Sequence, residues 1–235
     1  MADCGPELEV GLVQQYDILK PNGKFKGKSY SEWAEEWWTK LLSEDPDGYR
    51  RDDDVVFLKG KYDYGDKGEM REPQTQPNVN KRLGNNGLTI CEGTSLFFPV
   101  IAAEFNEGDV NPGYENKILQ NESDCSACAK KDIDEGGQPD PKQVTINNDP
   151  IVDDFRPFRV KSKYFPLMVP KNSSLKDKME YVIPDGTYKA VTDGYWLFIK
   201  SLPASKAPYR LRFNATGRNQ YSNAGEYEIM VERCS

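Results

Sequence analysis

The acidic side chains are the first candidates for catalysis, because this chain of 235 residues contains no histidine. Without imidazole, no Ser–His dyad, Cys–His dyad or His-ligated metal can form. Hydrolysis would instead need two carboxylates roughly 5–10 Å apart. The acids that we consider for such a pair are Asp52, Asp53, Asp54, Glu104, Glu107, Asp153 and Asp154. Nothing in their spacing shows that any two lie that close, so we expect no enzyme and keep a carboxylate-dependent hydrolase as an alternative.

Five cysteines form the second group of reactive side chains, at Cys4, Cys91, Cys125, Cys128 and Cys234. Cys125 and Cys128 form a Cys-x-x-Cys motif in a polar stretch that lacks the strand and helix of a thioredoxin-like motif. A zinc site needs four ligands, so we favour a disulfide or two free thiols over a metal or redox site. Cys4 and Cys234 lie near the two ends of the chain, which are often close in space. A disulfide between them would clasp the termini, and the odd number leaves at least one thiol unpaired within the chain.

A short acidic string is the densest set of hard oxygen ligands in the sequence. Asp132, Asp134 and Glu135 stand beside two glycines, and calcium prefers carboxylate and carbonyl oxygens. The ligand spacing of an EF-hand is absent. These residues therefore predict a calcium site of low specificity, and the sequence indicates no other cofactor.

The clearest predicted element is an amphipathic helix over residues 29–42. Ser29 and Glu32 form a capping box, in which each side chain accepts a hydrogen bond from an N–H group of the first turn. Large and apolar residues recur at helical spacing on one face, at Tyr30, Trp33, Ala34, Trp37, Trp38, Leu41 and Leu42. We expect this face to anchor the helix on a hydrophobic core.

A second interpretation of the tryptophans is an exposed aromatic platform. Trp33, Trp37 and Trp38 of the predicted helix, together with Trp196, could stack on a sugar ring or on a partner if they were exposed. This interpretation would make the protein a carbohydrate-binding module.

The rest of the chain predicts β-structure. Residues 209–214 and 226–232 alternate between apolar and polar side chains, which is typical of strands with one buried face. Asp193-Gly194 separates two apolar runs and predicts a hairpin turn. Further strands are predicted at 55–58, 88–90, 95–101, 187–191 and 195–199, with edge strands within 156–169. Short strands at this spacing predict a mainly β (α+β) fold, a β-sandwich or jelly-roll-like body with the helix packed on it.

Two polar stretches interrupt the pattern, at about 63–87 and 106–150. Structureless loops of this length are uncommon inside a compact domain. We interpret them as long insertions in a single domain over residues 1–235. The second is a functional excursion, an arm that contacts a partner, or a small substructure tied by Cys125 and Cys128.

Composition narrows the classes of partner. The formal net charge is −7, which argues against nucleic acid because such binding needs a basic surface. No apolar run approaches the 18 or more residues of a membrane span. The N-terminal residues show no signal peptide.

Aromatic and glycine landmarks give the chain a family resemblance. They include Tyr30-x2-Trp33-x3-Trp37-Trp38, Val56-Phe57-Leu58-x-Gly60, Gly93-x3-Phe97-Phe98-Pro99-Val100, Asp193-Gly194-Tyr195-Trp196 and Ser201-Leu202-Pro203. With the runs at 209–213 and 227–231, they resemble a loosely defined family of uncharacterised, aromatic-rich proteins of environmental, often marine, microbes and of viruses. The resemblance covers about half of the chain in three blocks. It implies an aromatic-rich β-sandwich with an N-terminal helix, and no catalytic residues.

We therefore expect a non-catalytic structural or interaction protein, a component of a virion or cell-surface assembly. Its expected partners are proteins and, in the alternative interpretation, glycans. Its expected location is a virion or an extracellular surface. The two long polar stretches favour an assembly, because segments of this kind cannot bury their own surface within one chain and can contact neighbouring molecules.

Overall fold

The structure, a computed structural model, describes residues 16–42, 54–63, 88–109, 118–170, 185–217 and 222–234. In these residues the chain forms two six-stranded sheets, which we call sheet I and sheet II, and a hairpin of β2 with β3. The strands are β1 (Asp17–Ile18), β2 (Lys24–Phe25), β3 (Lys28–Ser29), β4 (Val55–Phe57), β5 (Lys61–Asp63), β6 (Leu88–Cys91), β7 (Ser95–Asn106), β8 (Val144–Ile146), β9 (Asp149–Pro150), β10 (Arg159–Lys161), β11 (Phe165–Val169), β12 (Gly186–Ser201), β13 (Tyr209–Thr216) and β14 (Ser222–Glu232). The helices are α1 (Tyr30–Leu42) and α3 (Glu122–Gly136), with 3-10 turns at Pro141–Gln143 and Arg156–Phe158.

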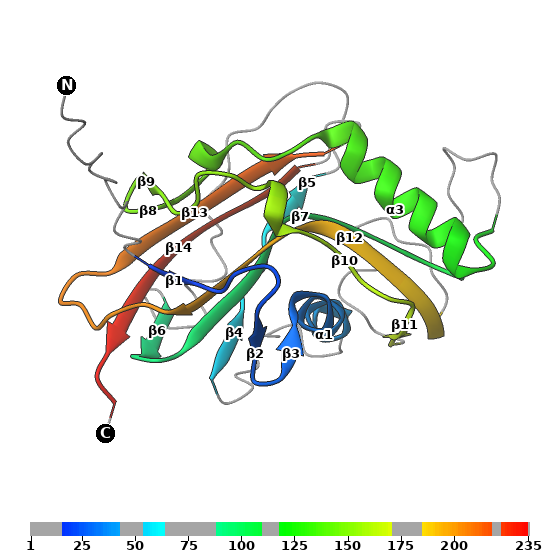
Figure 1. Ribbon diagram of the computed structural model, residues 1–235. Helices are drawn as coiled ribbons and strands as arrows, with labels where there is room; N and C mark the ends of the chain where they lie inside the picture. The colour runs from blue at the N-terminus through cyan, green and yellow to red at the C-terminus, as the bar shows by residue number, and fades with distance from the viewer. Residues whose placement is uncertain are drawn as a thin grey trace, which may run out of the picture.

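Sheet I is built around the long strand β12, which pairs antiparallel with β7. Three short strands, β1, β10 and β11, pair one after another with the other edge of β12, and β4 pairs parallel with β7. Figure 1 shows β12 as a long curved strand, with α1 and α3 on opposite sides of it. The edge strands expected within 156–169 are confirmed as β10 and β11.

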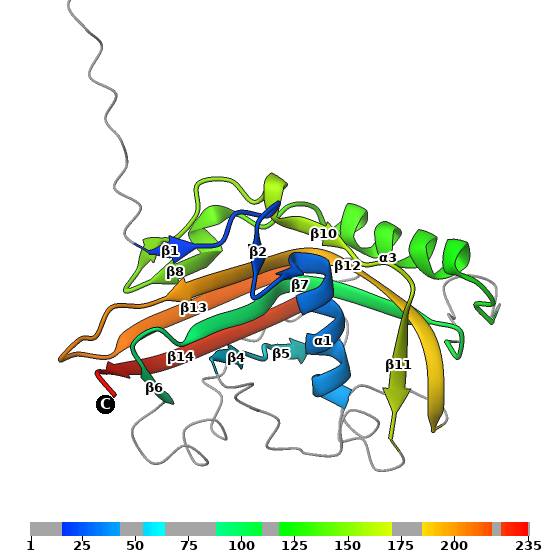
Figure 2. The same cartoon turned by 60° about the horizontal axis from the view of Figure 1, so that its bottom comes forward.

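Sheet II is built around the antiparallel pair of β13 and β14, which run side by side in Figures 1 and 2. β14 also pairs with β5 and β6, while β13 pairs with β8, which pairs in turn with β9. Both strands alternate between buried and more exposed residues, as the sequence predicts. This alternation gives sheet II one face toward the core and one toward solvent.

The main hydrophobic core lies between the two sheets. Phe98 of β7 stacks on Phe213 of β13 with ring centroids 4.9 Å apart, and Phe213 stacks on Tyr227 of β14 at 6.3 Å. Buried aliphatic side chains from both sheets surround these rings. The predicted mainly β, sandwich-like α+β body is therefore confirmed.

A bulge in β7 ties the two sheets together. The register between β12 and β7 shifts between Tyr195 and Trp196, so β7 has one extra residue at this point. Pro99 lies at the shift, where its missing N–H is tolerated. The buried side chain of Asn223 in sheet II donates to the carbonyl oxygens of Pro99 at 2.9 Å and of Val100 at 3.1 Å. The opposite sheet thus satisfies carbonyl groups at the bulge.

Helix α1 covers the outer face of sheet I, and the predicted helix is confirmed. The backbone N–H of Ser29 donates to Oε2 of Glu32 at 2.7 Å, and the N–H of Glu32 donates back to Oγ of Ser29 at 3.4 Å. All seven residues of the predicted aromatic and apolar face are buried. They pack against residues of β4, β7, β11 and β12 in a second core.

The predicted hairpin at Asp193-Gly194 is wrong, because β12 continues through both residues. A Cβ atom on Gly194 would lie 2.5 Å from Cβ of Ala102 and 2.6 Å from the carbonyl oxygen of Ile101. Glycine therefore marks a close approach of two strands here, which is its other common role in a sheet.

The described part of the stretch expected as an insertion at about 106–150 is regular structure that packs on sheet I and pairs with sheet II. Residues 118–150 contain α3, a 3-10 turn and the strands β8 and β9. The apolar face of α3 is made mainly of small side chains, at Cys125, Cys128, Ala129 and Ile133. Because these side chains are small, the apolar periodicity of this segment is weak, and the sequence did not predict the helix. The other expected insertion lies, from residue 64 to 87, outside the described residues.

No helix in the described part of the chain is long and apolar enough to cross a membrane.

Candidate functional site

The four tryptophans are buried, so they form no exposed platform. Trp33, Trp37 and Trp38 are 2%, 1% and 4% exposed, and Trp196 is fully buried. Trp196 stacks on Phe97 with ring centroids 5.3 Å apart, and Trp37 meets it edge-on at 5.5 Å. These rings attach α1 to sheet I, where their burial stabilises the fold. The prediction of an aromatic binding platform is wrong for these residues, and the carbohydrate-binding interpretation loses its motivation.

The residues predicted to bind calcium lie on α3 and do not converge. Within its last two turns, Asp132 and Glu135 are three residues apart and share a side of the helix, whereas Asp134 lies on another side of the helix axis. Asp134 pairs with Lys130, and Glu135 with Lys131 at 3.8 Å, each one helical turn away. Among the described residues, no group of three or more His, Cys, Asp or Glu side chains could hold a metal ion. The calcium prediction is therefore wrong for this acidic string.

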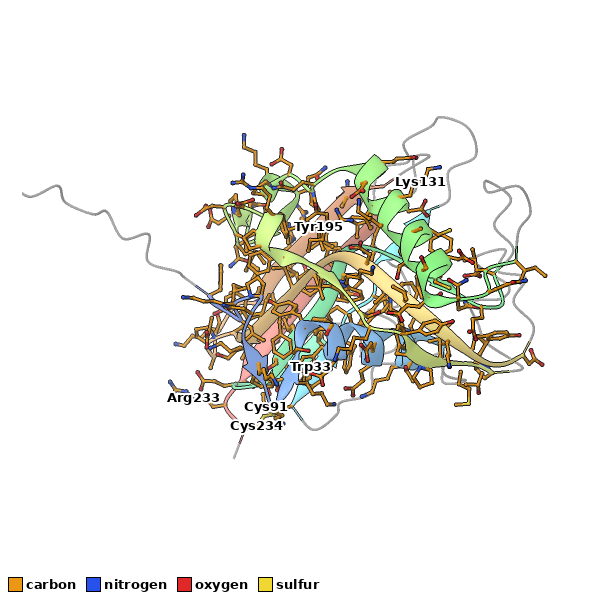
Figure 3. The ribbon with its side chains drawn as sticks, turned by 45° about the vertical axis from the view of Figure 1, so that its right-hand side comes forward. Trp33, Cys91, Lys131, Tyr195, Arg233 and Cys234 are labelled. Atoms are coloured by element: carbon orange, nitrogen blue, oxygen red, sulfur yellow. A yellow bond between two sulfur atoms is a disulfide. The ribbon has the colours of Figure 1, made fainter. Side chains whose placement is uncertain are left out.

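The disulfide joins Cys91, the last residue of β6, to Cys234. Their Cα atoms are 5.4 Å apart, and Figure 3 shows the two cysteines together, far from Lys131 on α3. The expected pairing of Cys234 with Cys4 is wrong, and Cys4 itself lies outside the described residues. β6 runs parallel to β14 and places Cys91 opposite Glu232, so strand register brings Cys91 to the C-terminal segment.

Cys125 and Cys128 are free thiols on the buried face of α3. This outcome agrees with one of the two states favoured from the sequence and corrects the other, a disulfide. Burial raises the pKa of Cys125 to about 12 and that of Cys128 to about 11. Nearby carboxylates add to both shifts, Asp109 first at Cys125 and Asp132 first at Cys128. Because the thiolate is the nucleophile and the metal ligand, these two cysteines are packing residues.

Acidic groups gather where β7 ends. The fully buried Asn106 donates from Nδ2 to Oε1 of Glu104 at 3.2 Å, and its backbone N–H donates to Oδ2 of Asp109 at 2.8 Å. Burial raises the pKa of Asp109 to about 7, although the hydrogen bond from Asn106 opposes this rise. Asn106 therefore connects a buried glutamate to an aspartate that titrates near neutral pH.

Other acids considered for a catalytic pair lie elsewhere. Asp153 is exposed, and Asp154 pairs with Arg156 at 2.9 Å. Asp52 and Asp53 lie outside the described residues. Glu104 and Asp109 thus share Asn106 as a hydrogen-bond partner, and the sequence did not single out Asp109.

Arg159 of β10 fastens α3 to sheet I. Its Nε and Nη2 donate to the two carboxylate oxygens of Asp193 at 2.9 Å each, and its Nη1 donates to Asp134 at 2.6 Å. The side chain of Asp193 is only 4% exposed, so the bidentate pair neutralises a buried charge. Asp193, followed by Asp134, holds the pKa of Arg159 above its usual range.

An ordered set of accessible charges lies on the outer face of sheet II. We define this face by eight residues of β13 and β14: Arg210, Arg212, Asn214, Thr216, Ser222, Ala224, Glu226 and Glu228. Nη2 of Arg212 lies 3.0 Å from Oε1 of Glu226, and Nη2 of Arg210 lies 3.3 Å from Oε1 of Glu228. The side chains of Arg210 and Glu228 are 47% and 45% exposed. The face therefore presents a row of arginines beside a row of glutamates.

No protein-family model, curated protein or solved structure matches this chain. Its function is therefore inferred from the side chains described above. The alternation of charged and apolar residues along 209–214 and 226–232 was a visible signal for the outer face of sheet II. Nothing in the sequence connected Arg159 to Asp193, because they are 34 positions apart.

Proposed function

We propose that this protein is a non-catalytic structural or interaction protein, a component of a virion or cell-surface assembly, which binds a protein partner through the outer face of sheet II. The observation that supports the proposal is the contrast between the two sheets. α1 covers sheet I with buried aromatic rings, whereas sheet II presents ordered rows of Arg and Glu. Exposed ion pairs contribute little to stability, but across an interface the same charges select the partner and set its register.

The disulfide supports the proposed location. Disulfides persist in oxidising environments and are rare in the cytosol. The Cys91–Cys234 bond suits a protein that works on a virion or an extracellular surface. The resemblance to proteins of environmental microbes and viruses points in the same direction.

Chemical footprinting of the native assembly tests the proposal. Particles or envelopes from the source organism, and the isolated chain, would be treated with phenylglyoxal for arginine and with a carbodiimide and an amine for carboxylates. We expect Arg210, Arg212, Glu226 and Glu228 to be labelled less in the native preparation. Arg156, whose side chain is 79% exposed, serves as the reference and should react equally in both. Equal labelling of the four face residues in both preparations would contradict the proposal.

A carboxylate-dependent hydrolase is the second candidate, supported by Glu104 and Asp109, which both accept hydrogen bonds from Asn106. A carboxyl group whose pKa burial raises to about 7 is typical of general acid–base chemistry. If a glycoside or ester substrate is turned over, Asp109→Asn and Glu104→Gln should each lower kcat at least about a hundredfold. Unchanged rates in both variants would exclude this candidate.

A further inference from the structure

We infer that the outer face of sheet II binds the same face of a second copy of this chain, related to the first by a two-fold axis parallel to β13 and β14. This inference rests on the proposed function and names the partner of the proposed surface. Two-fold dimers are the commonest closed assemblies, and their interface uses one self-complementary patch twice.

The register of β13 with β14 places the charged side chains in one half of the face and the small, uncharged side chains in the other half. Arg210 pairs with Glu228 and Arg212 with Glu226, so both charged rows occupy the same half of the face. In the other half, β13 and β14 contribute only uncharged side chains, in the pairs Asn214 with Ala224 and Thr216 with Ser222, and the register of β5 brings Lys61 beside Ala224 and Asp63 beside Ser222. One end of the β13–β14 pair is therefore long and charged, and the other is short and uncharged.

A two-fold rotation about an axis running between β13 and β14 matches both halves. It lays β13 of one copy over β14 of the other and leaves each residue at its own level along the strands. The arginine row of each copy then faces the glutamate row of the other. The small residues face small residues, which permits the close approach of about 10 Å that packed sheets adopt. An axis across the strands would instead lay each strand over its own copy in the reverse direction, so that no arginine would face a glutamate.

The charge of the whole chain makes this face the favourable point of approach. The formal net charge is −7, so two copies repel each other at most orientations. The two arginines balance Glu226 and Glu228, and Glu232, farther along the same side of β14, adds only one negative charge. Self-association is therefore least opposed here, and the facing rows add attraction that neighbouring exposed pairs within one chain do not supply.

Charge reversal with complementation tests the inference on the full chain. Sedimentation equilibrium should give a mass that rises with concentration toward twice the 26.7 kDa of one chain. The dimer should weaken at least tenfold between about 0.05 M and about 1 M salt, because screening shortens to about 3 Å. R210E/R212E and E226R/E228R should each be monomeric, since each turns the face into like charges. An equimolar mixture of the two variants should restore the dimer as a heterodimer.

Controls separate folding and net charge from the interface. The variant K20E/K161E reverses two exposed lysines on other elements with the same change in net charge as R210E/R212E, and it should still dimerise. The neutral variant R210Q/R212Q avoids like charges across the strands and should dimerise at least tenfold more weakly than the wild type. Circular dichroism melts check that each variant folds.

Two results would overturn the inference. One is a wild-type chain that stays monomeric at every concentration and salt used. The other is a dimer that survives both reversals or is not restored by mixing. If the chain is monomeric while the face is still protected in the native assembly, the proposed function stands and the partner is a different protein. If the face is unprotected as well, both fail.

Discussion

Single side chains beneath α3 carry charge in places from which water is largely excluded. The free-energy cost of burying a carboxylate is offset in different ways at Asp109 and Asp193. Asp193 is paired with a bidentate arginine, whereas burial favours the protonated form of Asp109. The arginine pair therefore predicts a response to substitution, and Asp109 predicts a response to pH.

Asp109 predicts a fold that is less stable at alkaline pH. Its pKa is about 7 in the folded chain and about 4 when unfolded, so the unfolding free energy falls as pH rises through this window. We expect the Tm to be about 5 °C higher near pH 5 than near pH 8. Asp109→Asn, which can still accept the hydrogen bond from Asn106, should lose most of that difference. Thermal melts at several pH values measure it.

The titration of Asp134 does not contribute to the change in Tm between pH 5 and pH 8. Hydrogen bonds from Lys130 and then from Arg159 hold its pKa below the usual range, so it stays ionised near pH 5. An Asp109→Asn variant with the same pH dependence as the wild type would show that another group is responsible.

Arg159 predicts a large loss of stability on substitution. Arg159→Gln leaves the carboxylate of Asp193 buried without a counter-charge, which costs about 3 kcal/mol or more. Adding Asp193→Asn removes the unpaired charge and should recover part of the loss. Urea titrations measure both changes. Arg156→Gln, at an exposed arginine, should stay within about 0.5 kcal/mol of the wild type.

At the scale of elements, α3 is attached by few apolar contacts. Its buried side chains are two cysteines, an alanine and an isoleucine, and an isolated helix of 15 residues is marginal in water. Arg159, which Asp193 of β12 holds in place, adds a charged link to α3 through Asp134. A segment held in this way opens locally more readily than the strands beneath it.

The thiols of α3 report this opening. In a Cys4→Ser background, Cys125 and Cys128 should react with a thiol reagent at least about a hundredfold more slowly than in the unfolded chain. Arg159→Gln should speed the reaction tenfold or more, because each loss of about 1.4 kcal/mol is tenfold in the open population. Mass spectrometry after timed labelling identifies the cysteine. Rapid labelling of both in the folded wild type would contradict the docked position of α3.

The continuity of β12 predicts a cost for a methyl group at Gly194. Gly194→Ala would press on Ala102 and the backbone of β7, and overpacking of this kind costs about 1–3 kcal/mol. Denaturant unfolding measures the loss. Thr187→Ala, at an exposed position of the same strand, should change stability by about 0.5 kcal/mol at most. A fully stable Gly194→Ala would contradict the close approach of β12 and β7 at this residue.

At the scale of the whole molecule, the disulfide closes most of the chain into a loop. Cys91 and Cys234 are 143 positions apart, and the loop-entropy relation gives a stabilisation of about 5 kcal/mol as an upper value. C91S/C234S should therefore lower the Tm by 10 °C or more, while Cys4→Ser should leave it unchanged. Peptide mapping without reduction should find Cys91 linked to Cys234, and a peptide linked through Cys4 would contradict the structure.

Elements with a local pattern could be predicted from the sequence. α1 and its cap lie where the aromatic spacing placed them, and β13 and β14 lie where apolar and polar residues alternate. α3 was missed because small apolar residues give it little contrast. The turn at Asp193-Gly194 was wrong because glycine serves both turns and close strand contacts, and the sequence does not distinguish the two.

The sequence by itself determined which segments have a buried face and which residue types are available for chemistry. Backbone geometry repeats every few residues, so a local pattern is sufficient to identify a helix or a strand. Only the tertiary structure decided that the tryptophans are buried, that Cys234 meets Cys91, and that Asp109 rather than Asp153 shares Asn106 with Glu104. These contacts join residues on different strands and helices. They depend on how the whole core packs, and no local spacing encodes them.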